Sequence, residues 1–191
     1  MTEIVTLTKT EYLFGYLEED MQPLIDMILA NYTEGRNMAG DVTHIRFEDI
    51  RINFTPQVQR IARILCDAWK DSFGEEIELC WQNKEGQDPN SSFWAVVHNH
   101  NESTNLHSHE TSDNYENGAH VSAAIWIQVP PNSGNLVFRY NINPYKVRQE
   151  EVEAKPGKFA MFDSTLPHHV TKNCSNEQRI VISMNFKYKQ I

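Results

Sequence analysis

Residues 155–170 read KPGKFAMFDSTLPHHV, and this stretch says most about the fold. Lys155-Pro156-Gly157 is a turn signal, because proline fixes one backbone dihedral and glycine tolerates conformations that other residues avoid. The apolar run 158–162 that follows predicts a short buried strand. Polar residues 163–165 then lead into Leu166-Pro167-His168-His169-Val170. A tight turn, then a short strand, then a second polar turn is a pattern typical of a β-rich domain.

Short apolar or alternating runs of the same kind occur on both sides of this stretch. We predict further strands at 77–81, 93–97, 121–129, 136–140 and 179–188. Short strands separated by turn signals at intervals of roughly 8–12 residues indicate a sandwich or barrel. A doubly wound α/β fold would need helices between the strands, and the sequence shows none there.

The N-terminal part has a different pattern. Apolar residues in 17–30 recur at spacings of three and four, which predicts one face of a helix. Thr55 suits a helix N-cap, Pro56 the first helical position and Gly74 the residue after the last turn. No repeat or linker interrupts the chain. We therefore expect a single domain, 1–191, in which a helical support region, 1–75, packs on a jelly-roll core, 76–191.

Composition limits the class of protein. The 191 residues include 17 Lys and Arg against 26 Asp and Glu, a net charge of −9 that disfavours a nucleic-acid partner. No run approaches the ~20 apolar residues of a membrane helix. The first residues, MTEIVTLTKTEYLF, lack the features of a signal peptide, and the three cysteines form no CxxC pair. We expect a cytoplasmic protein, and an exposed edge strand that can pair two copies as a homodimer.

Histidine is the unusual residue, since seven of the eight lie between positions 98 and 169. In an extended segment, His107 and His109 would point to the same face, a spacing that suits chelation of one metal ion. His98-Asn99-His100 has the same form, and either pair alone is more often a polar loop. His168 follows some sixty residues later.

An arginine is predicted among the core-facing residues of the last strand. Arg179 opens an alternating strand and shares one face with Val181 and Ser183. A buried arginine is costly unless it is paired, and a carboxylate that it can bind with two hydrogen bonds is a good partner. Taken alone, Arg179 also fits an exposed position at a strand end.

The order of these motifs resembles the iron(II)/2-oxoglutarate-dependent oxygenases, over roughly residues 92–188. It is most similar to a small, largely uncharacterised H-x-H branch found in bacteria and their viruses, which implies a location in the host cytoplasm if a virus encodes the chain. The matching segments, in chain order, are His107-Ser108-His109, the strand 123–127, Pro131 through Phe138, Pro156-Gly157 through Phe162, Leu166-Pro167-His168-His169-Val170, and Arg179 with the closing strand.

The resemblance implies a mainly β fold with N-terminal helices, built on a double-stranded β-helix, a cupin-like jelly roll. It implies iron(II) held by His107, His109 and His168, with 2-oxoglutarate bound by Arg179 and Ser183. The implied activity couples oxidative decarboxylation of 2-oxoglutarate to hydroxylation of a further substrate by O2. The sequence carries no motif that identifies this substrate. His98 and His100 are expected at a polar rim, and Trp94, Trp126 and Phe138 inside the barrel.

The chain departs from the broad family at the second ligand position, where His109 replaces the usual aspartate or glutamate. Three histidines can form the site, Glu110 or Asp113 can complete a standard triad, or the site is degenerate. We favour the three histidines.

Two other functions remain open on the sequence. The first is a cupin-type metalloenzyme with three histidines that does not use 2-oxoglutarate. Against it, the glutamate usual in cupins is missing, and Arg179 would have no function in such an enzyme. The second is a non-catalytic jelly-roll binding module with surface histidines.

Overall fold

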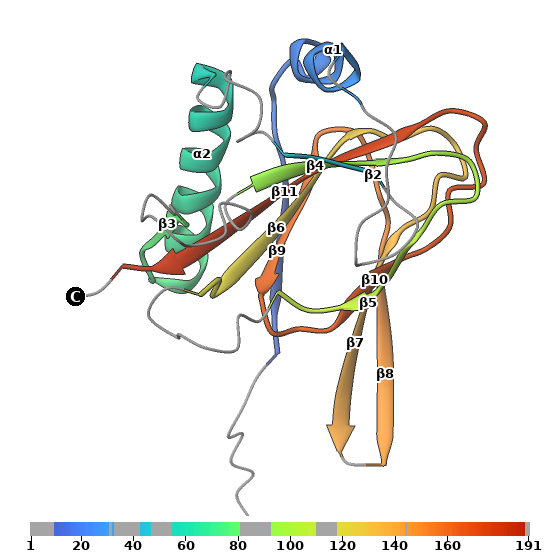
Figure 1. The fold of residues 1–191 in the computed structure, drawn as a ribbon. Coiled ribbons are helices and arrows are strands. Elements are labelled where there is room, and N and C mark those ends of the chain that lie inside the picture. Colours follow the sequence, from blue (N-terminus) through green and yellow to red (C-terminus); the bar gives the residue numbers. More distant parts are fainter. Residues whose placement is uncertain are drawn as a thin grey trace, which may run out of the picture.

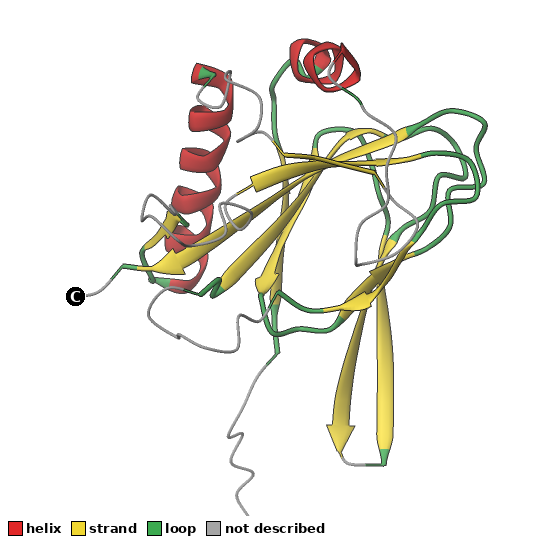
Figure 2. Ribbon diagram, viewed as in Figure 1, coloured by secondary structure: helices red, strands yellow, loops and turns green. Residues whose placement is uncertain are grey.

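The computed structural model describes residues 10–30, 32, 43–46, 55–80, 93–109, 118–143 and 145–189. Within these ranges the chain is mostly strand, with two helices on one side (Figure 1, Figure 2). The strands form two sheets, and every strand pair is antiparallel.

The larger sheet has seven strands. In order across the sheet, six of them are β1 (Tyr12–Tyr16), β9 (Lys158–Asp163), β6 (Val121–Gln128), β11 (Arg179–Tyr188), β4 (Phe93–His98) and β2 (Thr43–Arg46). The seventh strand, β3 (Ile77–Leu79), pairs with the end of β11.

The smaller sheet has four strands, in the order β5 (Thr104–His107), β10 (His168–Val170), β7 (Leu136–Asn143) and β8 (Lys146–Val152). The two sheets face each other across an apolar core that includes Trp126, Phe138 and Phe162. The predicted mainly β jelly roll with N-terminal helices is confirmed.

Two helices complete the described chain, α1 (Gln22–Ala30) and α2 (Pro56–Phe73). The Thr55 hydroxyl accepts a hydrogen bond from the Val58 N–H at 3.1 Å, which caps the start of α2. Gly74 has a φ of 74° and its N–H donates to Lys70 O at 2.8 Å, which closes the last turn. The predicted ends of this helix are confirmed. Neither helix is long and apolar enough to cross a membrane.

Alternation along β11 decides which side chains reach the space between the sheets. Ile180, Ile182 and Met184 belong to the core shared with both helices, in which burial contributes about 1.5–3 kcal/mol for each large aliphatic side chain. Residues of opposite parity therefore point between the sheets. Arg179 and Ser183 lie on this inner face.

The N-terminal part differs from the prediction because it supplies strands as well as helices. β1 extends the large sheet by pairing with β9, with Tyr12 opposite Phe162. Leu17, predicted as helical, instead donates its N–H to Gly157 O at 2.8 Å and continues this edge. Because residue 17 belongs to the sheet edge, α1 begins only at Gln22. The predicted residue 81 of the third strand lies outside the described residues.

Candidate metal centre

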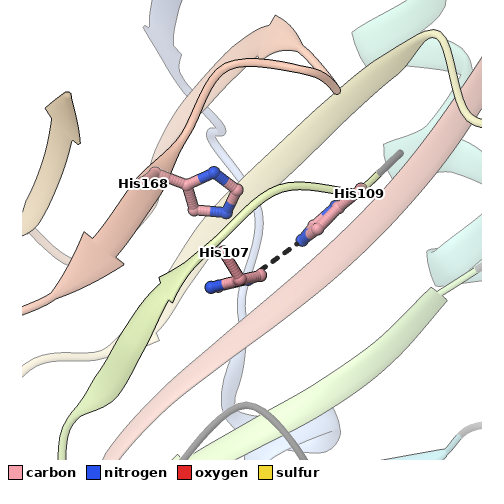
Figure 3. A group of neighbouring side chains, drawn as sticks. All are labelled: His107, His109 and His168. Carbon is pink, nitrogen blue, oxygen red and sulfur yellow. Dashed lines mark hydrogen bonds between the residues drawn. The ribbon is translucent and has the colours of Figure 1, made fainter. Parts of the chain in front are cut away.

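Three imidazole rings meet between the sheets (Figure 3). His107 ends β5 and His168 begins β10, and these residues are partners in the antiparallel register. His109 follows just beyond the end of β5, where its N–H donates to Ser164 O at 2.8 Å. One nitrogen from each ring lies within 4.8 Å of the other two. The predicted convergence is observed, although the turn of the chain after β5, rather than strand alternation, brings in His109.

Backbone carbonyls fix the tautomer of two of the rings. His107 Nδ1 lies 2.8 Å from Asn105 O, and His168 Nδ1 lies 2.8 Å from Leu166 O. A carbonyl oxygen only accepts hydrogen bonds, so Nδ1 of each ring carries the proton. Nε2 of each ring then has a free lone pair, which is the form that binds a metal.

Two polar side chains orient the third ring. His109 Nδ1 lies 2.8 Å from Ser122 Oγ and 3.0 Å from Asn185 Oδ1. The Ser122 hydroxyl itself donates to Asn185 Oδ1 at 2.8 Å, so it accepts from the imidazole. His109 therefore has the same tautomer as the other two rings. Sequence reasoning missed Ser122 and Asn185, whose only signal was a polar residue on the inner face of an apolar strand.

The short distance between the Nε2 atoms of two rings favours a bound cation between them. His107 Nε2 and His109 Nε2 are 3.2 Å apart, and in this tautomer neither carries a proton to share. Facing lone pairs repel unless a positive charge lies between them. Two nitrogens each about 2.1 Å from one ion, at a right angle, are about 3.0 Å apart, which is close to the observed separation. The donor set of three imidazoles suits zinc, copper, iron or nickel.

Burial favours the neutral form of two of the rings, His168 and His107. The pKa of His168 is held well below the usual 6.5, first by burial and then by the nearby His109 and His107 rings. Burial also lowers the pKa of His107. A ring that stays neutral does not have to lose a proton before it binds a metal, so the site is prepared for a cation at neutral pH.

A cavity of about 170 Å³ adjoins the three rings. Its walls are mostly apolar, and Ser183 contributes a hydroxyl from the inner face of β11. His98 and Thr104 also line it, with His98 Nε2 2.8 Å from Thr104 Oγ1. The expectation that His98 lies at a polar rim is wrong: the residue is 1% exposed, because β4 turns it inward.

Arg179 lies on the same face of β11 as the cavity-lining Val181 and Ser183, and its register partner is His98. The side chain has no exposed surface. Nη1 donates to Ser133 O at 2.7 Å, whereas Nε and Nη2 have no partner among the described residues. Burial lowers the pKa of Arg179 to about 10, which leaves it charged at neutral pH. A buried cation with two unused donors matches a carboxylate.

Other predicted residues have different positions. His169 is half-buried beside His168. Trp126 and Phe138 fill the core between the sheets, as expected. Glu110 and Asp113, the alternative carboxylate ligands, lie outside the described residues.

Comparison with known proteins finds a matching family. Residues 92–185, about half of the chain, match the model of a family described as "Putative 2OG-Fe(II) oxygenase". No curated protein matches the chain significantly.

Solved structures share the fold at low identity. A prolyl-4-hydroxylase from Pseudomonas putida is 13% identical, with a TM-score of 0.64, over 95% of this chain and 94% of that one. The non-heme alpha-ketoglutarate-dependent epimerase SnoN from nogalamycin biosynthesis is 14% identical, with a TM-score of 0.68, over 93% and 78%. HygX from Streptomyces hygroscopicus, solved with nickel, 2-oxoglutarate and hygromycin B, is 10% identical, with a TM-score of 0.61, over 93% and 82%.

The fold is thus the double-stranded β-helix, with a cluster of metal-type ligands between its sheets. Together with the family match, this places the chain in the 2OG-Fe(II) oxygenases, where 2OG is 2-oxoglutarate. The narrower H-x-H branch, with its bacterial and viral range, stays a prediction.

Proposed function

We propose that this enzyme binds iron(II) through His107, His109 and His168 and couples 2-oxoglutarate decarboxylation to hydroxylation of a second substrate. The observation that carries the proposal is the convergence of three imidazole rings between the sheets, with one nitrogen of each ring within 4.8 Å of the other two. Bound iron and 2-oxoglutarate would supply the chemistry, in which one atom of O2 enters the substrate and the other enters succinate, with release of CO2.

The chain's own contribution begins with orientation of the rings. Asn105 O and Leu166 O accept the Nδ1 protons of His107 and His168, and Asn185 with Ser122 accepts that of His109. Such contacts increase the basicity of the ligating nitrogen and prevent rotation of the ring. Three rings fixed in this way leave further coordination positions of the ion to 2-oxoglutarate and O2.

Arg179 is proposed to bind the distal carboxylate of 2-oxoglutarate, and Ser183 to add a hydrogen bond. The unused Nε and Nη2 donors of Arg179 would be satisfied by this carboxylate. The apolar walls, which include Trp126, Leu136 and Phe162, exclude water and strengthen these charge interactions.

Arg179 also favours this function over the two alternative functions, the cupin-type metalloenzyme and the non-catalytic binding module. A cupin-type enzyme without 2-oxoglutarate has no carboxylate for a buried guanidinium to bind. A non-catalytic module has no use for three rings in one tautomer around a shared point. Neither rival accounts for both features together.

The test uses the purified protein under anaerobic conditions. Iron(II) with 2-oxoglutarate is expected to give a weak visible metal-to-ligand charge-transfer band. His168→Ala should abolish metal binding, whereas His169→Ala, its neighbour in the chain, should retain it. Iron affinity that survives both His107→Ala and His168→Ala would leave only the binding-module interpretation. Metal binding without a 2-oxoglutarate band would favour the cupin-type enzyme.

A further inference from the structure

The hairpin of β7 and β8 extends well beyond the barrel (Figure 1). β7 pairs with β8 along its length, but with β10 only over Leu136–Phe138. One further bond follows, from Arg139 N–H to Pro167 O at 2.8 Å. Pro167 has no N–H to return, and β10 begins only at the next residue. The outer half of β7 therefore has one edge without a neighbouring strand among the described residues.

The open edge presents backbone groups in a known direction. In an antiparallel strand, alternate residues direct both N–H and C=O to the same neighbour. Since Arg139 N–H points toward the β10 side, the N–H and C=O of Asn141 point there too. Continued pairing would place Asn141 opposite Thr165. Instead, both residues line a cleft of about 590 Å³, a size within the range of ligand sites.

This cleft adjoins the segments that carry the metal-type ligands. Leu106 and Pro167 line it, and they directly precede His107 and His168 in the chain. A molecule held in the cleft would thus lie along the segments that position two of the three rings. Leu106 is 45% exposed and offers apolar surface to an occupant of the cleft.

Charge indicates what the occupant is. Among the described residues that line the cleft, Glu11, Glu75 and Asp163 carry negative charge and Arg139 alone carries positive charge. The chain as a whole has a net charge of −9. This surface repels phosphate groups and favours a positively charged molecule. An exposed strand edge with apolar side chains beside it is the arrangement that binds extended peptides by strand addition.

We propose that the cleft binds the substrate as an extended, basic polypeptide segment that adds as a strand to the open edge of β7 at Asn141. This inference rests on the proposed function, since the segment is the molecule to be hydroxylated. Backbone hydrogen bonds would provide affinity, and the acidic wall would select lysine- or arginine-containing sequences. The segment would then lie beside Leu106 and Pro167, which directly precede His107 and His168 in the chain.

The test uses three pools of degenerate decapeptides with blocked termini. One pool is rich in Lys and Arg, one is rich in Asp and Glu, and the third is the basic pool with N-methylated backbones. Binding of the basic pool should slow hydrogen exchange of the Asn141 amide and accelerate 2-oxoglutarate turnover, with a gain of one oxygen atom in the peptides. The acidic and N-methylated pools should do neither.

Two variants at one position test the geometry. Asn141→Pro removes the N–H on the open side while leaving the bonds to β8, and should weaken binding of the basic pool about fivefold. Asn141→Ala keeps the N–H and should bind like wild type. Equal binding by the two variants, equal binding of the basic and N-methylated pools, or no binding of any pool would overturn the proposal.

Metal and 2-oxoglutarate binding by the wild-type protein separate the two hypotheses. If the charge-transfer band forms but no pool binds, the peptide proposal fails alone. If the band never forms, the proposed function fails, and exchange protection at Asn141 still reports whether the cleft binds a peptide.

Discussion

Replacing Arg179 by methionine should make the protein more stable when empty and unable to bind 2-oxoglutarate. Methionine has a similar length and no charge, so it can fill the space of the guanidinium without leaving buried donors unpaired. If Arg179 is retained for a carboxylate ligand, its substitution should have opposite effects on stability and on binding.

The expected sizes follow from the hydrogen bonds of Arg179. Nε and Nη2 are buried without partners, and each unpaired donor costs about 1–3 kcal/mol. The substitution also removes the bond to Ser133 O, a loss of about 1 kcal/mol. The net gain of about 1–5 kcal/mol should raise the Tm of the empty protein by roughly 2–20 °C, at about 2–4 °C per kcal/mol for a chain of this size.

The effect on binding has the opposite sign. A carboxylate buried without its cation costs about 2–5 kcal/mol, so 2-oxoglutarate should bind roughly 30-fold to several thousand-fold more weakly. Thermal unfolding with and without ligand measures both effects, because 2-oxoglutarate at 100 times its Kd should stabilise the metal-loaded wild type by about 2.7 kcal/mol. A destabilised Arg179→Met variant whose ligand-induced Tm shift equals that of wild type would refute the reasoning.

Three further predictions test other parts of the structure. Asn185→Ala removes an acceptor of the His109 Nδ1 proton and should weaken iron binding about 10–100-fold in a chelator competition; an unchanged affinity would show that the contact does not matter. In the unfolded chain His168 takes up a proton near pH 6.5, whereas in the fold it stays neutral, so the unfolded state binds more protons. The metal-free protein should therefore lose stability as the pH falls below about 6.5, and His168→Gln should show a smaller loss when Tm is followed against pH. Burial raises the pKa of the Cys66 thiol to about 11, so iodoacetamide at pH 8 should label the exposed Cys174 first in the folded protein; equally rapid labelling of Cys66, seen by peptide mass, would contradict this.

Local signals were sufficient for the elements with a clear period. The α2 helix carries its N-cap, its proline and its terminal glycine in the sequence, and in the structure the helix lies between them. The alternating apolar pattern of β11 and the turn residues before β9 also identified these elements in the sequence. β1 was missed, because its stability comes from pairing with β9 rather than from its own pattern.

The histidines and Arg179 could be selected from the sequence because of residue type and order. The residues that surround them in the structure could not be identified from the sequence. Ser122 and Asn185 are 63 positions apart and meet only because β6 and β11 are neighbours in the sheet. His98 looked like a loop residue, and the register of β4 against β11 makes it part of the cavity wall.

The amino-acid sequence by itself determined which residues have the chemistry to bind a metal and a carboxylate, since ligand type and side-chain charge are properties of single residues. Only the tertiary structure decided that His107 and His168 are register partners and that Arg179 has two donors left over. It also decided that, within the described ranges, the outer half of β7 has an edge without a neighbouring strand, next to the segments that carry His107 and His168. These properties depend on which strands become neighbours and where a ladder ends, and that is settled by the packing of the whole chain.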